Sequence, residues 1–115
     1  LEQNRIYIFC MSCGICYNNE VRVIKTFEDK EAKKIYSGYK SMKIDQSIQK
    51  VAYRKLKMLN NAHKIKDLRM PPSNNLEKLK GDLRGHFSIR VNSQYRVLFR
   101  WENGDAYDVE IVDYH

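Results

Sequence analysis

Residues 86–112 have the sequence HFSIRVNSQYRVLFRWENGDAYDVEIV, and this stretch decides the fold. Apolar and polar residues alternate through 86–91, 95–101 and 106–112, which is the period of a strand with one buried face. The second and third runs are joined through Asn103-Gly104, a dipeptide typical of a two-residue hairpin turn. We therefore predict a three-stranded antiparallel meander.

Two helices are predicted upstream of the meander. Residues 46–60 carry apolar side chains at helical spacing, and Asp45 is a suitable N-cap. Residues 29–39 predict a shorter helix that ends at Gly38 or soon after it. The weak alternation of 23–27 predicts a short strand before this helix. The Pro- and Asn-rich residues 71–75 predict a surface loop. The expected architecture is α+β: a short N-terminal strand, two helices, and the meander packed on the helices.

The charge is concentrated in the middle of the chain. The 115 residues suit one domain, with 21 Lys and Arg against 14 Asp and Glu and a formal net charge of +7. Residues 40–100 hold 15 basic and four acidic residues, whereas residues 101–115 hold five acids and no Lys or Arg. This excess of positive charge is expected for a surface that binds phosphates or an acidic partner. The alternative is a soluble surface that is simply rich in lysine.

The first 22 residues differ from the rest. They carry Cys10, Cys13 and Cys16, a spacing that suits a metal or an iron–sulfur cluster but lacks a fourth cysteine, so we expect no metal and no cofactor. Their apolar run is too short to cross a bilayer or to serve as a signal peptide, which predicts a cytoplasmic protein with reduced thiols. We expect residues 1–22 to be an extension outside the domain 23–115, either flexible or the product of an upstream start site.

Several segments of the chain resemble one family. They are VIKTF (23–27), PPSNNLE (71–77), LKGDLRG (79–85), SIRVN (88–92), YRVLFRW (95–101) and VEIVDYH (109–115). Residues 23–115 thereby resemble the HigB plasmid-maintenance killer toxins of the RelE/ParE superfamily. The resemblance implies a RelE-like, microbial-RNase-type fold and an enzyme that cuts mRNA in the ribosomal A site. It also implies a HigA-type helix-turn-helix antitoxin as partner, with operator DNA bound only through the antitoxin and with no membrane.

RNA cleavage of this kind needs proton transfer and positive charge. A base takes the proton of a 2′-OH, cations stabilise the phosphorane, and an acid protonates the leaving 5′-oxygen, without a metal. His115 is the preferred acid or base because imidazole titrates near neutrality. Arg96 and Lys80 match the active-site cations of the family. Asp113 and Tyr114 are expected to orient His115 or share proton transfer, and Tyr114 could instead stack on a base.

Other residues have less specific expected roles. Glu77 stands close to where some members of the family carry a histidine, so it is a candidate base, and it could equally be a surface residue. The sheet face opposite the apolar one is expected to be a cationic surface exposed to solvent, formed by a row of His86, Ser88, Arg90, Arg96 and Arg100. The side chains predicted to contact RNA or the ribosome are Arg54, Lys57, Arg84, Arg90 and Arg100.

The sequence is also compatible with other roles for these residues and with other functions. Residues 113–115 could be only a frayed tail, and Arg96 could pair with Asp108 or Glu110 across the sheet. Among functions, the alternative to an endoribonuclease is a non-enzymatic ParE-like inhibitor of DNA gyrase on the same scaffold. A third hypothesis is a protein that only binds RNA. It predicts RNA binding that depends strongly on salt and yields no cleavage product.

Overall fold

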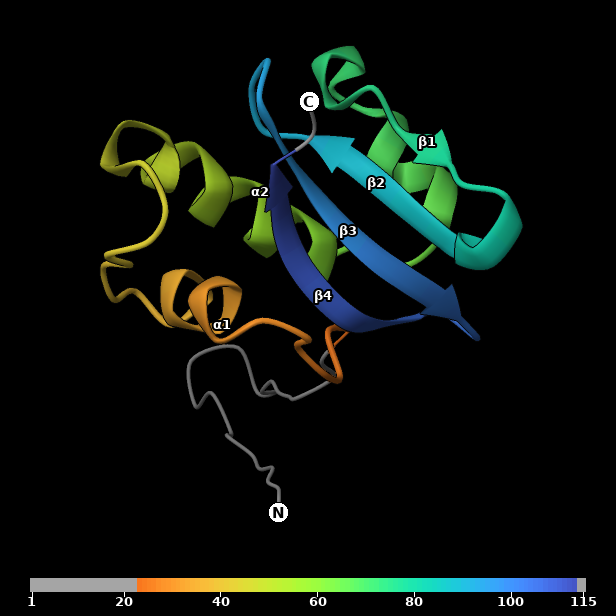
Figure 1. Ribbon diagram of the computed structural model, residues 1–115. Coiled ribbons are helices and arrows are strands. Elements are labelled where there is room, and N and C mark those ends of the chain that lie inside the picture. The colour runs from red at the N-terminus through yellow and green to blue at the C-terminus, as the bar shows by residue number, and fades with distance from the viewer. Residues whose placement is uncertain (1–22, 114–115) are drawn as a thin grey trace, which may run out of the picture.

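The computed structural model of the chain describes residues 23–113 (Figure 1). Its α-helices are α1 (Lys30–Tyr36) and α2 (Gln49–Asn60), and its strands are β1 (Glu77–Lys78), β2 (His86–Arg90), β3 (Tyr95–Glu102) and β4 (Asp105–Asp113). Short 3-10 helices occupy Gln46–Ile48, Ile65–Arg69, Pro72–Asn74 and Gly81–Leu83. The predicted α+β class, with two helices ahead of an antiparallel meander, is confirmed.

The sheet is antiparallel with the order β1-β2-β3-β4. The three predicted strands form its main part, and the turn between β3 and β4 has positive φ at both Asn103 (54°) and Gly104 (83°), as the hairpin signal indicated. The sequence did not predict β1, which pairs with β2 through only Glu77 and Lys78. Two residues are too few to show a strand period.

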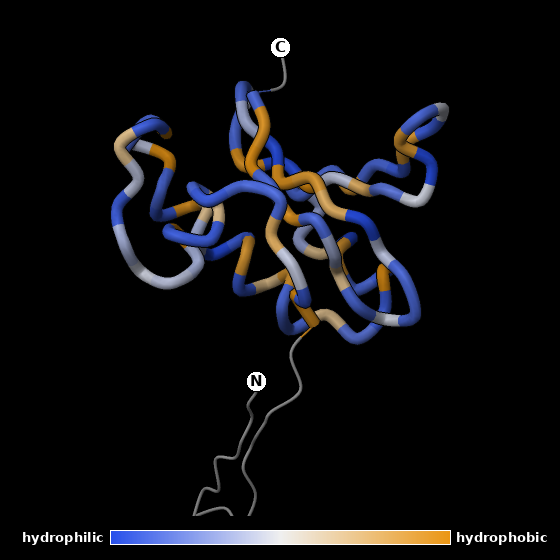
Figure 2. The backbone as a smooth tube through the Cα atoms, turned by 60° about the horizontal axis from the view of Figure 1, so that its bottom comes forward, coloured by the Kyte–Doolittle hydropathy of each residue, from blue (hydrophilic) through white to orange (hydrophobic). Residues whose placement is uncertain are grey.

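One face of the sheet carries the core. Buried apolar side chains of the strands, including Ile89, Val97, Phe99 and Val109, join those of the helices in one cluster. In Figure 1, α2 crosses behind the sheet, and α1 contacts both α2 and β4. Figure 2 shows hydrophobic and hydrophilic residues alternating along the tube, as expected where each element has one buried face. The opposite face of the sheet is covered by no α-helix of the described residues.

The predicted N-terminal strand is not a regular one. Residues 23–28 run beside β4, yet they form only two isolated parallel bridges, Ile24 with Ala106 and Phe27 with Val109. Between the bridges, Asp108 adopts a left-handed conformation (φ 55°) and its N–H donates to the Thr26 hydroxyl at 2.7 Å. This kink in β4 interrupts its pairing with residues 23–28. The predicted N-terminal strand therefore lies beside β4, but it does not form a regular strand.

The helix and loop predictions also needed adjustment. The first turn of the predicted helix 46–60 is a 3-10 turn capped by Asp45, whose carboxylate accepts the Ser47 N–H at 2.9 Å. The predicted helix 29–39 ends at Tyr36, shortly before Gly38, the residue expected to end it, which takes a left-handed φ of 90°. Within the predicted loop, Asn74 is fully buried. The predicted surface loop therefore also contributes to the interior of the protein.

Candidate active site on the open face of the sheet

The face of the sheet opposite the core is not a simple cationic surface. Strand alternation places Ser88 of β2 and Arg96 of β3 there, as the sequence predicted. Ser88 is fully buried, however, and Arg96 is only 5% exposed. The segment around Asn75 and Glu77 covers them, since both residues contact the Arg96 guanidinium. The prediction that this whole row faces solvent is therefore wrong.

The Arg96 guanidinium is held by neighbouring strands and loop. Its Nε donates to the Ser88 hydroxyl at 2.8 Å, and its Nη2 donates to the backbone carbonyls of Asn75 at 2.5 Å and Ser88 at 3.2 Å. Asn75 presents its carbonyl from a left-handed conformation, with φ 45°. Planar guanidinium groups fixed in this way keep their charge in one place. Arg96 is thus a preorganised cation.

Glu77 lies beside this cation. Its Oε1 is 3.9 Å from Arg96 Nη2, and its side chain is 41% exposed. The carboxylate therefore faces solvent on one side and a fixed positive charge on the other. Asp108, one of the two carboxylates considered as an alternative partner of Arg96, instead accepts from Arg100 Nε at 3.2 Å.

Lys80 and Asp113 are the other predicted site residues that the structure describes. Lys80 is exposed and precedes the 3-10 helix Gly81–Leu83; within residues 23–113 its ammonium forms no ion pair. Asp113 ends β4 opposite Tyr95, the neighbour of Arg96, and accepts from Gln94 Nε2 at 3.0 Å. Tyr114 and His115, the other predicted site residues, lie outside the described part of the chain.

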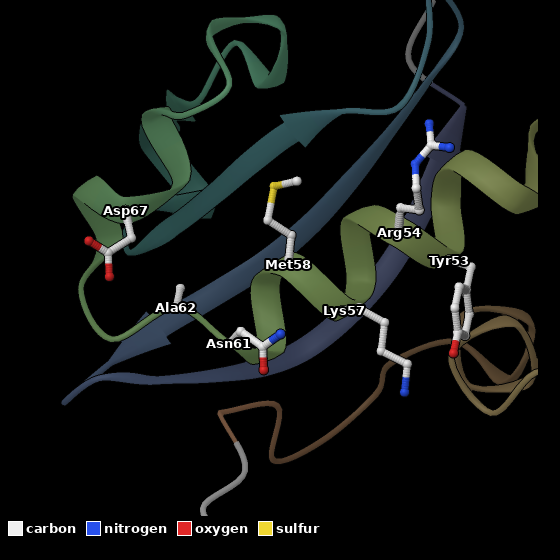
Figure 3. Close-up of a pocket in the computed structure, with 7 residues that line it drawn as sticks. All are labelled: Tyr53, Arg54, Lys57, Met58, Asn61, Ala62 and Asp67. Atoms are coloured by element: carbon white, nitrogen blue, oxygen red, sulfur yellow. The ribbon is translucent and has the colours of Figure 1, made fainter.

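The five predicted RNA contacts do not share one surface. Arg84 is exposed after the 3-10 helix Gly81–Leu83, and Arg90 lies opposite Arg96 at the end of β2. Arg100 is occupied by Asp108 and by Glu102, whose Oε1 lies 2.6 Å from Arg100 Nη1, and these bonds raise its pKa. The remaining two, Arg54 and Lys57, lie on α2, on the other side of the sheet (Figure 3).

Sequence reasoning missed a buried polar pair behind the loop. Lys55 of α2 is 8% exposed, and its ammonium donates to Asn74 Oδ1 at 2.6 Å. Asn74 in turn donates through Nδ2 to the carbonyl of Leu68 at 3.0 Å and to that of Met70 at 3.3 Å. Burial lowers the pKa of Lys55. These hydrogen bonds of Asn74 fix the loop at the position directly before Asn75, whose backbone carbonyl accepts from Arg96.

Two further titratable groups, Glu110 and His86, lie on the open face, and neither was among the predicted site residues. Burial, followed by the nearby carboxylates of Glu28 and Asp29, raises the pKa of Glu110. The Nδ1 of His86 is buried and finds no hydrogen-bond partner among the residues that the structure describes. Within residues 23–113 no group of three or more His, Cys, Asp or Glu is arranged to hold a metal ion. No helix in that range is long and apolar enough to span a membrane.

Comparisons with known proteins bear on this site. Residues 25–115 match the family model described as the RelE-like toxin of the type II toxin-antitoxin system HigB. Toxin HigB-1 of Vibrio cholerae is 44% identical over 81 residues, which cover 70% of this chain and 85% of that protein. Endoribonuclease HigB of Proteus vulgaris is 34% identical over 94 residues, covering 81% of this chain and all of that protein.

A solved structure shares the fold. The YoeB-YefM complex from Staphylococcus aureus contains a chain that aligns with a TM-score of 0.52 at 18% identity, covering 80% of this chain and 97% of that one. At this identity the likeness concerns the fold alone, and it agrees with the RelE-like architecture predicted from the sequence.

Proposed function

Because the chain belongs to the HigB-like family of RelE-like toxins of type II toxin–antitoxin systems, we propose that it inhibits translation by cutting mRNA in the ribosomal A site. The observation that carries the proposal is the fixed Arg96 guanidinium with the half-exposed Glu77 carboxylate beside it. The similarity to a protein named an endoribonuclease supports the same activity.

The proposed reaction uses the nucleophile that RNA itself supplies. A base removes the proton from a 2′-OH, the 2′-oxygen bonds to phosphorus, and the bond from phosphorus to the 5′-oxygen breaks as an acid protonates that oxygen. The products are a 2′,3′-cyclic phosphate and a free 5′-OH. Arg96 and Lys80 supply positive charge to the phosphorane, so the proposed mechanism is independent of metal ions.

Glu77 and His115 are the proposed proton carriers. Glu77 lies next to the fixed cation, where a phosphate bound to Arg96 would bring a 2′-OH within its reach. His115 is the proposed acid. It follows Asp113, which ends β4 opposite the residue adjacent to Arg96. Asp113 and Tyr114 are proposed to orient His115, with Tyr114 alternatively stacking on a base. Arg84 and Arg90 are proposed to contact the RNA backbone.

The cellular setting is proposed with the activity. Residues 23–115 form the toxin domain, and residues 1–22 stand outside it. The partner is a HigA-type antitoxin with a helix-turn-helix domain, through which alone the complex meets operator DNA. A toxin that acts on translating ribosomes belongs in the cytoplasm.

Primer extension on mRNA bound to ribosomes tests the proposal. The full chain should produce cuts that are absent without ribosomes. His115→Ala, Arg96→Ala and Lys80→Ala should each lower cleavage by about 10²–10³-fold. Lys66→Ala serves as the control, because Lys66 is exposed in the 3-10 helix Ile65–Arg69. Intact mRNA from a wild-type protein that still arrests growth would overturn the proposal and would direct attention to DNA gyrase.

A further inference from the structure

A groove of about 500 Å³ runs along the helix side of the molecule, away from the proposed active site. Figure 3 shows the side chains that line it, which come from α2 and from the segment that follows: Tyr53, Arg54, Lys57, Met58, Asn61, Ala62 and Asp67. Because α2 packs on the core face of the sheet, this groove and the Arg96 side chain lie on opposite sides of the sheet.

The lining of the groove is mainly apolar. Met58 is half-buried, and its sulfur receives the Asn74 Nδ2–H at 3.1 Å, which fixes the side chain. Ala62 is 4% exposed, whereas Tyr53 is 39% exposed, so part of this aromatic residue can contact a partner. A space of this size and character suits one or two apolar side chains from a partner.

The rim of the groove is positively charged. Arg54 is exposed, and Lys57 Nζ lies 4.1 Å from the centroid of the Tyr36 ring and 5.2 Å from that of Tyr53. Neither cation forms an ion pair within residues 23–113. The two tyrosine rings hold Lys57 in place without cancelling its charge. Both cations therefore remain available to carboxylates of a partner.

The acidic residue of the groove does not offset this charge on the rim. The Asp67 carboxylate accepts the backbone N–H groups of His63 at 2.9 Å and Lys64 at 3.0 Å, and these bonds lower its pKa. The carboxylate is thus engaged in capping its own 3-10 helix. The occupant that this groove fits combines an apolar anchor with negative charge on either side of it.

We propose that the groove receives an acidic segment of the antitoxin, which places one apolar side chain against Met58 and Ala62 and carboxylates against Arg54 and Lys57. The inference rests on the proposed function. A protein segment fits better than RNA, because phosphates gain nothing from a thioether and a methyl group, while an amphipathic peptide uses both parts.

Isothermal titration of the full chain with its helix-turn-helix antitoxin tests the inference. Asn61 is exposed at the groove and has no place in the proposed RNA chemistry. Asn61→Glu should weaken binding by about tenfold, and Asn61→Lys should strengthen it severalfold, because an acidic occupant responds in opposite directions to opposite charges. Arg54→Glu should weaken binding at least as much as Asn61→Glu. Lys50→Glu, an equal charge reversal on α2 outside the groove, should change binding less than twofold.

Cleavage of ribosome-bound mRNA by the same variants separates the outcomes. Weaker antitoxin binding by Asn61→Glu with unchanged cleavage supports the inference. Unchanged affinity in both Asn61→Glu and Arg54→Glu overturns it and leaves the endoribonuclease proposal intact. Loss of cleavage with full antitoxin binding also overturns it, since the groove would then face RNA or the ribosome. Melting temperatures of all variants identify any that fail to fold.

Discussion

Arg96 Nε of β3 donates to the hydroxyl of Ser88 on the neighbouring strand β2 at 2.8 Å, and Ser88 is fully buried. Together with the backbone carbonyls of Ser88 and Asn75, this hydroxyl positions the cation to which we assign the phosphate. Ser88 has no surface from which to touch RNA, so its contribution to cleavage acts through Arg96.

Ser88→Ala should lower both stability and cleavage. Removing the hydroxyl takes one bond from a buried charged group, which costs about 1.5–3 kcal/mol of unfolding free energy, measured by urea denaturation. Displacement of the guanidinium should lower cleavage by about tenfold or more. Ser93→Ala, in the exposed turn between β2 and β3, is the control and should change neither quantity. Full cleavage by Ser88→Ala would show that Arg96 does not need this contact.

Glu77→Gln separates a base from a surface ion pair. The 3.9 Å contact with Arg96 is half-exposed, so its loss should change stability by less than about 1 kcal/mol. If Glu77 is the base, cleavage should fall by about 10²–10⁴-fold and the acidic limb of the pH–rate profile should change. Glu102→Gln is the control, because Glu102 is also an exposed carboxylate paired with an arginine. Equal cleavage by both variants would remove Glu77 from the mechanism.

Asn74→Ala should loosen the loop that holds Arg96. It leaves the buried Lys55 ammonium without its acceptor and two carbonyls without their donor, for an expected loss of about 2–4 kcal/mol. Since Asn75 follows directly, hydrogen exchange should accelerate across residues 71–77. The matched control is Asn61→Ala, at an exposed position. Unchanged exchange in Asn74→Ala would show that the loop is held in another way.

The carboxyl of Glu110 should make stability fall as pH rises. The folded-state pKa of Glu110 lies above 4.5, the usual value for a glutamate, because burial disfavours the charge. Above that pH the folded state therefore binds more protons than the unfolded state. Glu110→Gln should therefore raise the melting temperature at pH 7, and the gain should shrink as pH approaches 4.5. Thermal denaturation at several pH values measures this.

Glu31→Gln provides the comparison of opposite sign. The Ser41 hydroxyl donates to Glu31 at 2.5 Å and lowers the pKa of that carboxyl, so its stabilisation is present at neutral pH and is lost as pH falls through the folded-state pKa. Glu31→Gln should lower the melting temperature at pH 7 and have a diminishing effect in acid. Parallel pH curves for the two variants would contradict both assignments.

The sequence by itself determined the helices and strands in which apolar and polar residues alternate regularly over many positions. The alternation through residues 86–112 and the Asn103-Gly104 turn were sufficient for β2, β3 and β4, because strand pairing between neighbours in the chain depends on local signals. Helical spacing similarly located α2. The motifs quoted from the second half of the chain were enough to identify the family.

Only the tertiary structure decided what surrounds each charge. The sequence placed Arg96 on a solvent face, yet Asn75, 21 positions earlier, closes over it from a loop without any period. The same loop buries Lys55, and α2 carries Arg54 to the side of the sheet away from Arg96. Local periodicity assigns a side chain to a face of its own element. Whether that face is covered depends on contacts between distant segments, which only the folded chain brings together.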